Sequence, residues 1–257
     1  MNLLLDVGNT RIKWAIHLGS STEVFISSGD VVHAGRIAAA LTELPAAIRA
    51  SLDSGTKISR VFVVNVMGSE LRSLFTDLCM REFHLEVSFA ESELECLGLT
   101  NGYADVSQLG ADRWVGMLGA MDEGLVSFCV VDAGTAVTID FVVSGTSHTG
   151  GLILPGLALM RNALFAATGD IEGFSMRGNG KQADDLLGRS TDSAVHLGPV
   201  QAVVGTVERT LNRQKQPVRL IVTGGDAKVL LPHLAGYSPE DRPLLVLEGL
   251  AKLAAIA

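Results

Sequence analysis

The chain has 257 residues, of which 47% are hydrophobic and 19% are charged, and its formal net charge is −8 at pH 7. This is the composition of a globular chain that buries a substantial core, and it excludes an intrinsically disordered protein. The acidic balance and the lack of any apolar run of roughly 20 residues argue against a nucleic-acid-binding surface and against a membrane-spanning segment.

The first half of the chain reads as alternating strands and helices. Residues 2–6 are an apolar strand, 8–10 carry turn residues, and 11–16 alternate between apolar and polar side chains, so we predict a β-hairpin. Later patterns predict, in chain order, a helix over 34–52, a strand over 61–64, a helix from 68 towards 83, a strand over 85–89, a polar loop over 97–110 and a helix over 111–122.

The second half repeats the opening pattern. Residues 128–132 are another apolar strand that ends in an aspartate, a turn follows at 133–135, and residues 137–142 alternate like the second strand of a hairpin. The strand at 219–222 and the glycines after it resemble the strand at 61–64 followed by Gly68. These repeats predict a duplicated α/β domain with a cleft between the halves, and we place the two domains at 1–118 and 119–257.

Two aspartates mark the repeated turns. Asp6 and Asp132 each end an apolar strand, where a buried carboxylate needs a cation or hydrogen-bond donors. Gly8 and Gly134 follow them and allow backbone to approach a ligand closely, and Lys13 on the next strand could pair with a phosphate. The polar residues of the turns offer further donors: Asn9, Thr10 and Thr135. Each turn could equally be a tight turn closed by its own side chain.

The chain has no Walker-type phosphate loop and no protein-kinase glycine loop, so a nucleotide site here must be of another type. A duplicated Asp-x-Gly hairpin fits the actin-like, sugar-kinase-like architecture. The segment Gly110-Ala111-Asp112-Arg113-Trp114 places an acid beside a base at the start of a predicted helix. Asp112 could be a general base or a helix cap, and Arg113 could bind a substrate carboxylate or lie in solvent.

Other segments leave their roles open. The glycine-containing stretches 145–156 and 177–181 resemble active-site loops, although 150–156 could be a strand flanked by turns. The glycines at 224 and 225 fit either a nucleotide-binding turn or a plain strand–helix connection. Six histidines are scattered without ligand spacing and receive no role. The three cysteines are read as buried apolar residues of a cytoplasmic protein: Cys79, Cys96 and Cys129.

Taken together, these segments resemble the type III pantothenate kinases, also called the Bvg accessory factor family. The resemblance runs in order along nearly the whole chain. Its motifs are Asp6-Val7-Gly8-Asn9-Thr10, Gly110-Ala111-Asp112-Arg113-Trp114, Asp132 to Asp140, Gly151 to Gly156, Thr191-Asp192-Ser193-Ala194 with Gly198, Thr223-Gly224-Gly225-Asp226-Ala227 and Leu247-Glu248-Gly249-Leu250.

The resemblance implies a duplicated actin-like, ribonuclease-H-like fold and ATP-dependent phosphorylation of pantothenate, the first step towards coenzyme A. It implies Asp112 as general base, Asp6 close to Mg²⁺, and Asp132 as ligand of a monovalent cation, K⁺ or NH₄⁺. The first phosphate loop would comprise Asp6, Val7, Gly8, Asn9, Thr10, Arg11, Ile12 and Lys13. The remaining ATP contacts would be Gly134, Thr135, Gly224 and Gly225. The pantothenate pocket would contain Tyr103, Gly110, Ala111, Asp112, Arg113 and Thr191.

The resemblance further implies a homodimer in which Thr191 reaches a pocket shared with the partner subunit. Two alternatives remain at this point. One is another kinase of the same superfamily, acting on a sugar, acetate or an N-acetylhexosamine. The other is a non-enzymatic accessory factor for transcription, although no helix-turn-helix or basic patch supports contact with DNA.

Overall fold

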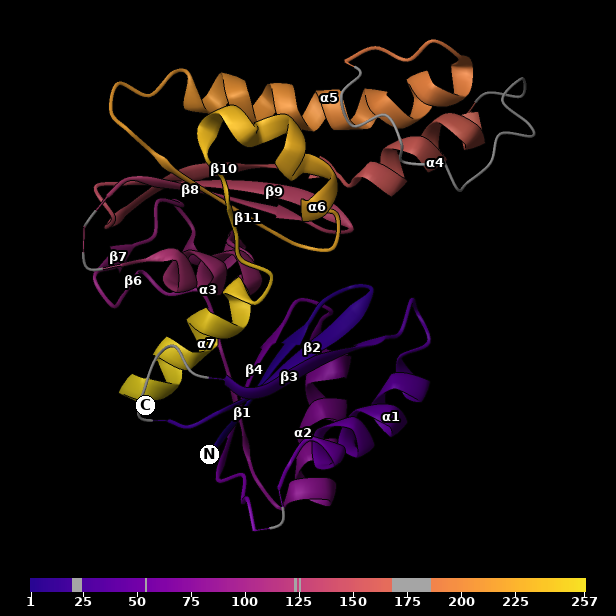
Figure 1. Cartoon of the computed structure of the whole chain (residues 1–257). Coiled ribbons are helices and arrows are strands. Elements are labelled where there is room, and N and C mark those ends of the chain that lie inside the picture. The colour runs from indigo at the N-terminus through magenta and orange to yellow at the C-terminus, as the bar shows by residue number, and fades with distance from the viewer. Residues whose placement is uncertain (20–24, 54, 123, 125, 168–185) are drawn as a thin grey trace. The chain divides into compact units, whose positions relative to one another are not determined.

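The computed structural model describes residues 1–19, 25–53, 55–122, 124, 126–167 and 186–257. By contacts the chain divides into two compact units (Figure 1). Unit 1 comprises Met1–Met121 and Leu244–Ala257, and unit 2 comprises Asp122–Pro243. This division differs from the expected boundary after residue 118 chiefly because the C-terminal helix belongs to unit 1.

Unit 1 is a mixed sheet with helices on both faces. Its strands follow the order β3-β2-β1-β4-β5, in which β1 pairs antiparallel with β2 and parallel with β4. The strand bounds are β1 (Asn2–Val7), β2 (Arg11–His17), β3 (Phe25–Val32), β4 (Arg60–Asn65) and β5 (Val87–Phe89). A short hairpin, β6 (Glu95–Cys96) and β7 (Leu99–Thr100), and the 3₁₀ helix η1 (Val106–Gln108) precede α3.

Two apolar clusters cover the two faces of this sheet. On one face lie α1 (Ile37–Ala50) and α2 (Ser69–Phe83) (Figure 1). They pack against alternate residues of β1, β2 and β4, and Phe75 is fully buried there. On the other face, α3 (Ala111–Ala120) and α7 (Leu245–Ile256) pack against the intervening residues, among them Leu4 and Phe62. The period of two along each strand therefore divides its side chains between two helical layers.

Unit 2 has the same strand topology as unit 1. Its strands follow the order β10-β9-β8-β11-β12, with β8 antiparallel to β9 and parallel to β11. The bounds are β8 (Phe128–Ala133), β9 (Ala136–Val143), β10 (Ser147–Pro155), β11 (Arg219–Thr223) and β12 (Glu240–Asp241). The helices are α4 (Leu157–Ala167), α5 (Thr191–Leu211), α6 (Ala227–Leu230) and the 3₁₀ helix η3 (Leu231–Tyr237). The predicted duplication is confirmed at the level of sheet order and strand direction.

Most of the predicted elements form, within a few residues of their expected bounds. Residues 150–156 belong largely to strand β10, so the loop interpretation of this stretch is wrong, while 177–181 lie outside the described residues. The sequence reading did not predict α4, α5 or α7. All three cysteines are free and buried, as expected.

Candidate functional site

The first predicted phosphate loop is the turn between β1 and β2. The Gly8 amide donates a hydrogen bond to the Arg11 carbonyl (3.1 Å), which closes the turn. In the antiparallel register Asp6 lies directly opposite Lys13, so the two side chains project from the same face of the sheet. The hairpin thereby combines a carboxylate, a cation and a run of turn amides in one place.

A second segment supports this loop through its carbonyl groups. The amides of His33 and Ala34 both donate to the Thr10 carbonyl (2.9 and 3.0 Å), and the His33 ring contacts the Gly8 carbonyl through Nε2 at 2.9 Å. His33 is 1% exposed. No sequence pattern indicates this contact, because the two partners are 25 residues apart and the histidines show no ligand spacing.

The predicted acid–base pair lies at the first turn of α3. The Asp112 carboxylate accepts a hydrogen bond from the Arg113 amide (2.8 Å), which fixes its orientation at the positive end of the helix dipole. Gly110 provides the necessary space, because a methyl group added there would lie 2.6 Å from Asp112 Oδ1. A residue without a side chain at position 110 therefore leaves room for the Asp112 carboxylate in this orientation.

Arg113 and Tyr103 meet in the same part of unit 1. Arg113 Nη1 donates to the Tyr103 hydroxyl (3.0 Å), and the guanidinium carbon lies 5.6 Å from the centre of the tyrosine ring. The Asn101 side chain accepts a hydrogen bond from the Tyr103 amide (3.0 Å). Asp105 caps η1, and hydrogen bonds from the Ser107 hydroxyl and amide lower the pKa of its carboxyl group. These contacts hold the loop before Asp112 in a defined shape.

Helix α7 packs against α3, the helix that carries Asp112, and forms hydrogen bonds with its C-terminal end. Lys252 Nζ donates to the carbonyls of Leu118 (3.0 Å), Gly119 (3.1 Å) and Met121 at the C-terminal end of α3. A cation at this end of a helix satisfies carbonyls that have no partner within the helix. The C-terminal segment of the chain thus fixes the position of the candidate base.

The second predicted phosphate loop lies in unit 2, after β8. The Gly134 amide donates to the Ala136 carbonyl (3.0 Å), and the Gly156 amide donates to the Thr135 carbonyl (3.0 Å). Gly224 adopts a φ of 96°, and a methyl group there would lie 2.5 Å from Asp132 Oδ1. The structure therefore brings together four predicted residues, Asp132, Gly134, Thr135 and Gly224, with Gly225 next in the chain. Gly156 completes the loop and was absent from the predicted site.

Comparison with known proteins decides the family. The family model for type III pantothenate kinase matches residues 2–213. The chain belongs to the type III pantothenate kinase family. A relative of that name from Marinobacter nauticus is 35% identical over 99% of this chain and 98% of its own length. Another from Thiobacillus denitrificans is 34% identical over 98% of this chain and 96% of its own.

Solved structures agree on the fold. A Baf family protein from Campylobacter jejuni superposes with a TM-score of 0.62 and 20% identity, covering 98% of this chain and 96% of its own. A glucokinase from Balamuthia mandrillaris gives a TM-score of 0.54 with 10% identity, covering 100% and 93%. At these identities the likeness concerns the fold alone, and it confirms the predicted actin-like class.

Thr191, the last predicted residue of the pantothenate pocket, belongs to unit 2, whereas Tyr103 and Arg113 belong to unit 1. It is the first residue of α5, and Ser190 before it forms a reciprocal cap with Ser193. The Ser190 hydroxyl accepts from the Ser193 amide (3.2 Å), and the Ser193 hydroxyl accepts from the Ser190 amide (3.0 Å). This cap holds Thr191 at a well-defined helix start.

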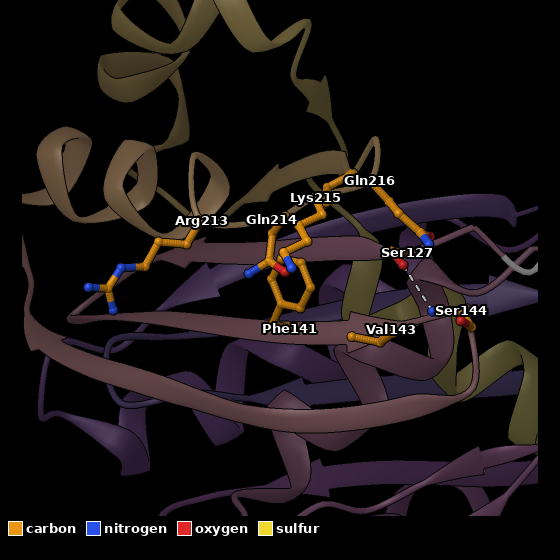
Figure 2. A pocket seen from close by; sticks show the side chains of 9 residues that line it. Ser127, Phe141, Val143, Ser144, Arg213, Gln214, Lys215 and Gln216 are labelled. Carbon is orange, nitrogen blue, oxygen red and sulfur yellow. Dashed lines mark hydrogen bonds between the residues drawn. The ribbon is translucent and has the colours of Figure 1, made fainter.

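Unit 2 also has a pocket of about 360 Å³ away from its predicted phosphate loop (Figure 2). Ser127 and Ser144 line it, joined by a hydrogen bond of 2.9 Å from the Ser144 amide to the Ser127 hydroxyl, together with Arg213 and Lys215. Ser127 precedes β8, whereas the predicted phosphate loop follows β8. The pocket therefore lies at the opposite end of this strand.

Proposed function

We propose that the chain transfers the γ-phosphoryl group of ATP to the hydroxyl of pantothenate, with the Asp112 carboxylate as general base. Family membership assigns the activity, which yields 4′-phosphopantothenate in coenzyme A biosynthesis. The observation that carries the role of Asp112 is its oriented carboxylate at the start of α3, beside a buried arginine. Phosphoryl transfer passes through a loose transition state, so an oriented carboxylate is sufficient to accept the proton.

We assign the ATP contacts to the two predicted phosphate loops and the pantothenate contacts to the residues around Arg113. The amides and Lys13 of the first loop hold phosphate oxygens of ATP, and so do Thr135, Gly134, Gly224 and Gly225 in unit 2. Arg113 takes the pantothenate carboxylate through its planar donors, and Tyr103 keeps that guanidinium in place. Gly110 and Ala111 form the wall of the same pocket, and in the homodimer Thr191 reaches a pocket shared with the partner subunit.

Divalent and monovalent cations complete the site. Among the described residues no group of three or more His, Cys, Asp or Glu side chains is placed to hold a metal. Mg²⁺ binds through one or two carboxylates and the phosphates of the substrate, and we propose that it lies near Asp6. For K⁺ or NH₄⁺ we propose Asp132, whose neighbours in the sheet are the hydroxyl residues Thr138 and Thr223. These cations supply positive charge that neutralises the transferring phosphoryl group.

We further propose a homodimer formed through unit 2. Large apolar side chains are exposed on β10, on α4 and just before α5: Ile153, Leu159, Leu164, Leu186 and Leu187. Such a concentration of exposed apolar side chains is typical of a protein interface. Ile153→Glu should yield monomers in sedimentation velocity experiments, whereas Leu94→Glu, at an equally exposed (66%) leucine of unit 1, should leave the dimer intact. Dimers of Ile153→Glu would refute this interface.

We propose a cytoplasmic enzyme without nucleic-acid or membrane partners. No helix within the described ranges is both long and apolar enough to cross a bilayer. The net charge of −8 disfavours polyanionic partners, and three buried free thiols fit a reducing compartment.

The test is a coupled assay for ADP release with ATP, Mg²⁺ and pantothenate, run in potassium and in sodium buffer. We expect pantothenate-dependent turnover that falls sharply in sodium. Asp112→Asn should lower kcat by about 10²- to 10⁴-fold while ATP still binds. Asp105→Asn is the matched control, because asparagine keeps the Oδ1 acceptor that caps η1, and no catalytic role is assigned to this nearby residue. Near-normal turnover by Asp112→Asn would exclude Asp112 as the base, and full activity in sodium would exclude a requirement for K⁺ or NH₄⁺.

A further inference from the structure

We infer that His33 is a positioning residue for the first phosphate loop, acting as a hydrogen-bond donor to the Gly8 carbonyl. A loop that presents its amides to phosphate must turn carbonyl groups away from the ligand. Those carbonyls still need donors, because a buried carbonyl without a partner is costly. The segment that follows β3 supplies them.

The hydrogen bonds determine which ring nitrogen of His33 carries the proton. The Gly35 amide donates to His33 Nδ1 (3.2 Å), and an amide can only donate, so Nδ1 is the acceptor. Nε2 therefore bears the hydrogen and donates to the Gly8 carbonyl at 2.9 Å. The imidazole is neutral in this arrangement and connects two backbone segments.

The backbone conformation after His33 directs further donors to the same loop. Ala34 has a φ of 45° and Gly35 a φ of 87°, so two successive residues are left-handed. This conformation is uncommon for a residue with a Cβ atom, as in Ala34. It allows the amides of His33 and Ala34 to donate together to the Thr10 carbonyl. Three donors thus converge on two carbonyls of the loop that we assign to ATP.

A second buried histidine provides a matched control. His17 is 0% exposed, and its Nδ1 accepts a hydrogen bond from the Gly19 amide (3.3 Å), as His33 does from Gly35. His17 lies opposite Asn2, at the other end of the β1–β2 pair from the phosphate loop. Replacing it should therefore disturb the same local motif without touching the loop.

This inference rests on the proposed function of residues 6–13. The experiment is therefore designed so that a failure of the proposed function can be told from a failure of the role of His33. Binding of ATP–Mg²⁺ to the wild type is measured by calorimetry, and turnover is measured independently. We expect His33→Asn, which retains an acceptor near Gly35 but cannot reach Gly8, to weaken ATP binding and raise the KM for ATP about tenfold. The KM for pantothenate should stay within about twofold. His17→Asn should lower Tm without changing the KM for ATP.

His33→Gln tests the role of the donor to Gly8 even if His33→Asn does not fold. Its side-chain amide reaches as far as Nε2 and restores the donor to Gly8, so the KM for ATP should return to within about threefold of the wild type at a lower Tm. A raised KM for ATP in His33→Gln, or an unchanged one in folded His33→Asn, would overturn the inference. A wild type that binds ATP without pantothenate-dependent turnover would refute the proposed function and leave the role of His33 standing.

Discussion

The contact between α3 and α7 offers a sharp test of how the fold positions Asp112. Gly249 on α7 faces the backbone of α3, and a methyl group added to it would overlap the Val115 carbonyl oxygen and lie 2.8 Å from the carbonyl carbon. Ordinary contacts begin at 3.4 Å, so in Gly249→Ala the helices must separate by more than half an ångström. Gly119 on α3 is equally close to α7, with the Gly249 amide 3.0 Å from its added methyl position.

The magnitude follows from two opposing terms. Alanine in place of glycine favours a helix by about 1 kcal/mol. Overpacking costs about 1–3 kcal/mol, and we take the upper value because the obstruction is backbone and has no rotamer to change. Gly249→Ala should therefore lose about 2 kcal/mol of stability, or about 4–8 °C in Tm. A helix displaced by this amount carries Asp112 with it, so kcat should fall about 10- to 100-fold.

Gly116→Ala is the control in the same interface. A methyl group there meets only Val246 Cγ2, at 3.9 Å, which is an ordinary contact. We expect this variant to be as active as the wild type and more stable, by up to about 1 kcal/mol. Urea unfolding and steady-state kinetics on both variants check the argument. Equal stability and activity in Gly249→Ala and Gly116→Ala would show that close backbone packing does not position α3.

Three further predictions concern stability and reactivity. Lys252→Met should cost about 1.5–3 kcal/mol in urea unfolding, because charge-assisted hydrogen bonds to the end of α3 are lost. The two hydrogen bonds from Arg219 (each 2.9 Å) hold the pKa of Glu240 below its usual 4.5. The stability that the ionised Glu240 contributes is fully present above pH 4.5 and is lost as the pH falls through the lowered pKa. In Glu240→Gln, Tm should therefore depend less on pH below 4.5. A thiol reagent should not react with the native protein. Burial raises the pKa of Cys79 and of Cys129 to about 12, and it also raises the pKa of Cys96.

The sequence was sufficient for the parts of the fold that depend on local pattern. Both Asp-x-Gly hairpins formed as predicted, because alternating strands and a glycine turn specify each of them locally. The long helix α5 was missed for the opposite reason. Its interior contains Gly198 and Pro199 and several β-branched valines, which all disfavour a helix as a local choice. Burial of those valines in the core of unit 2 stabilises the helix, and that burial is a tertiary effect.

Candidate site residues could be named from the sequence where chemistry and motif coincide, but the distant residues that support their backbone could not. Asp112 and Arg113 stand out in sequence because an acid and a base adjoin at a helix start. Nothing in the sequence links His33 to Gly8 or Lys252 to the end of α3, since those bonds join side chains to carbonyl groups. Carbonyl acceptors carry no residue signature, so such supports become visible only in the folded chain.

The duplicated topology also shows why two matching aspartates can differ in chemistry. Asp6 and Asp132 occupy the same place in their sheets, one residue before the end of the first strand. Asp6 is flanked by Lys13 and Val64, whereas Asp132 is flanked by two threonines. A carboxylate with a cation opposite it is already partly neutralised, and one between hydroxyl groups offers an oxygen-rich environment to a metal ion. The register of the neighbouring strands, rather than the repeated motif, therefore favours Asp132 as the ligand of the monovalent cation.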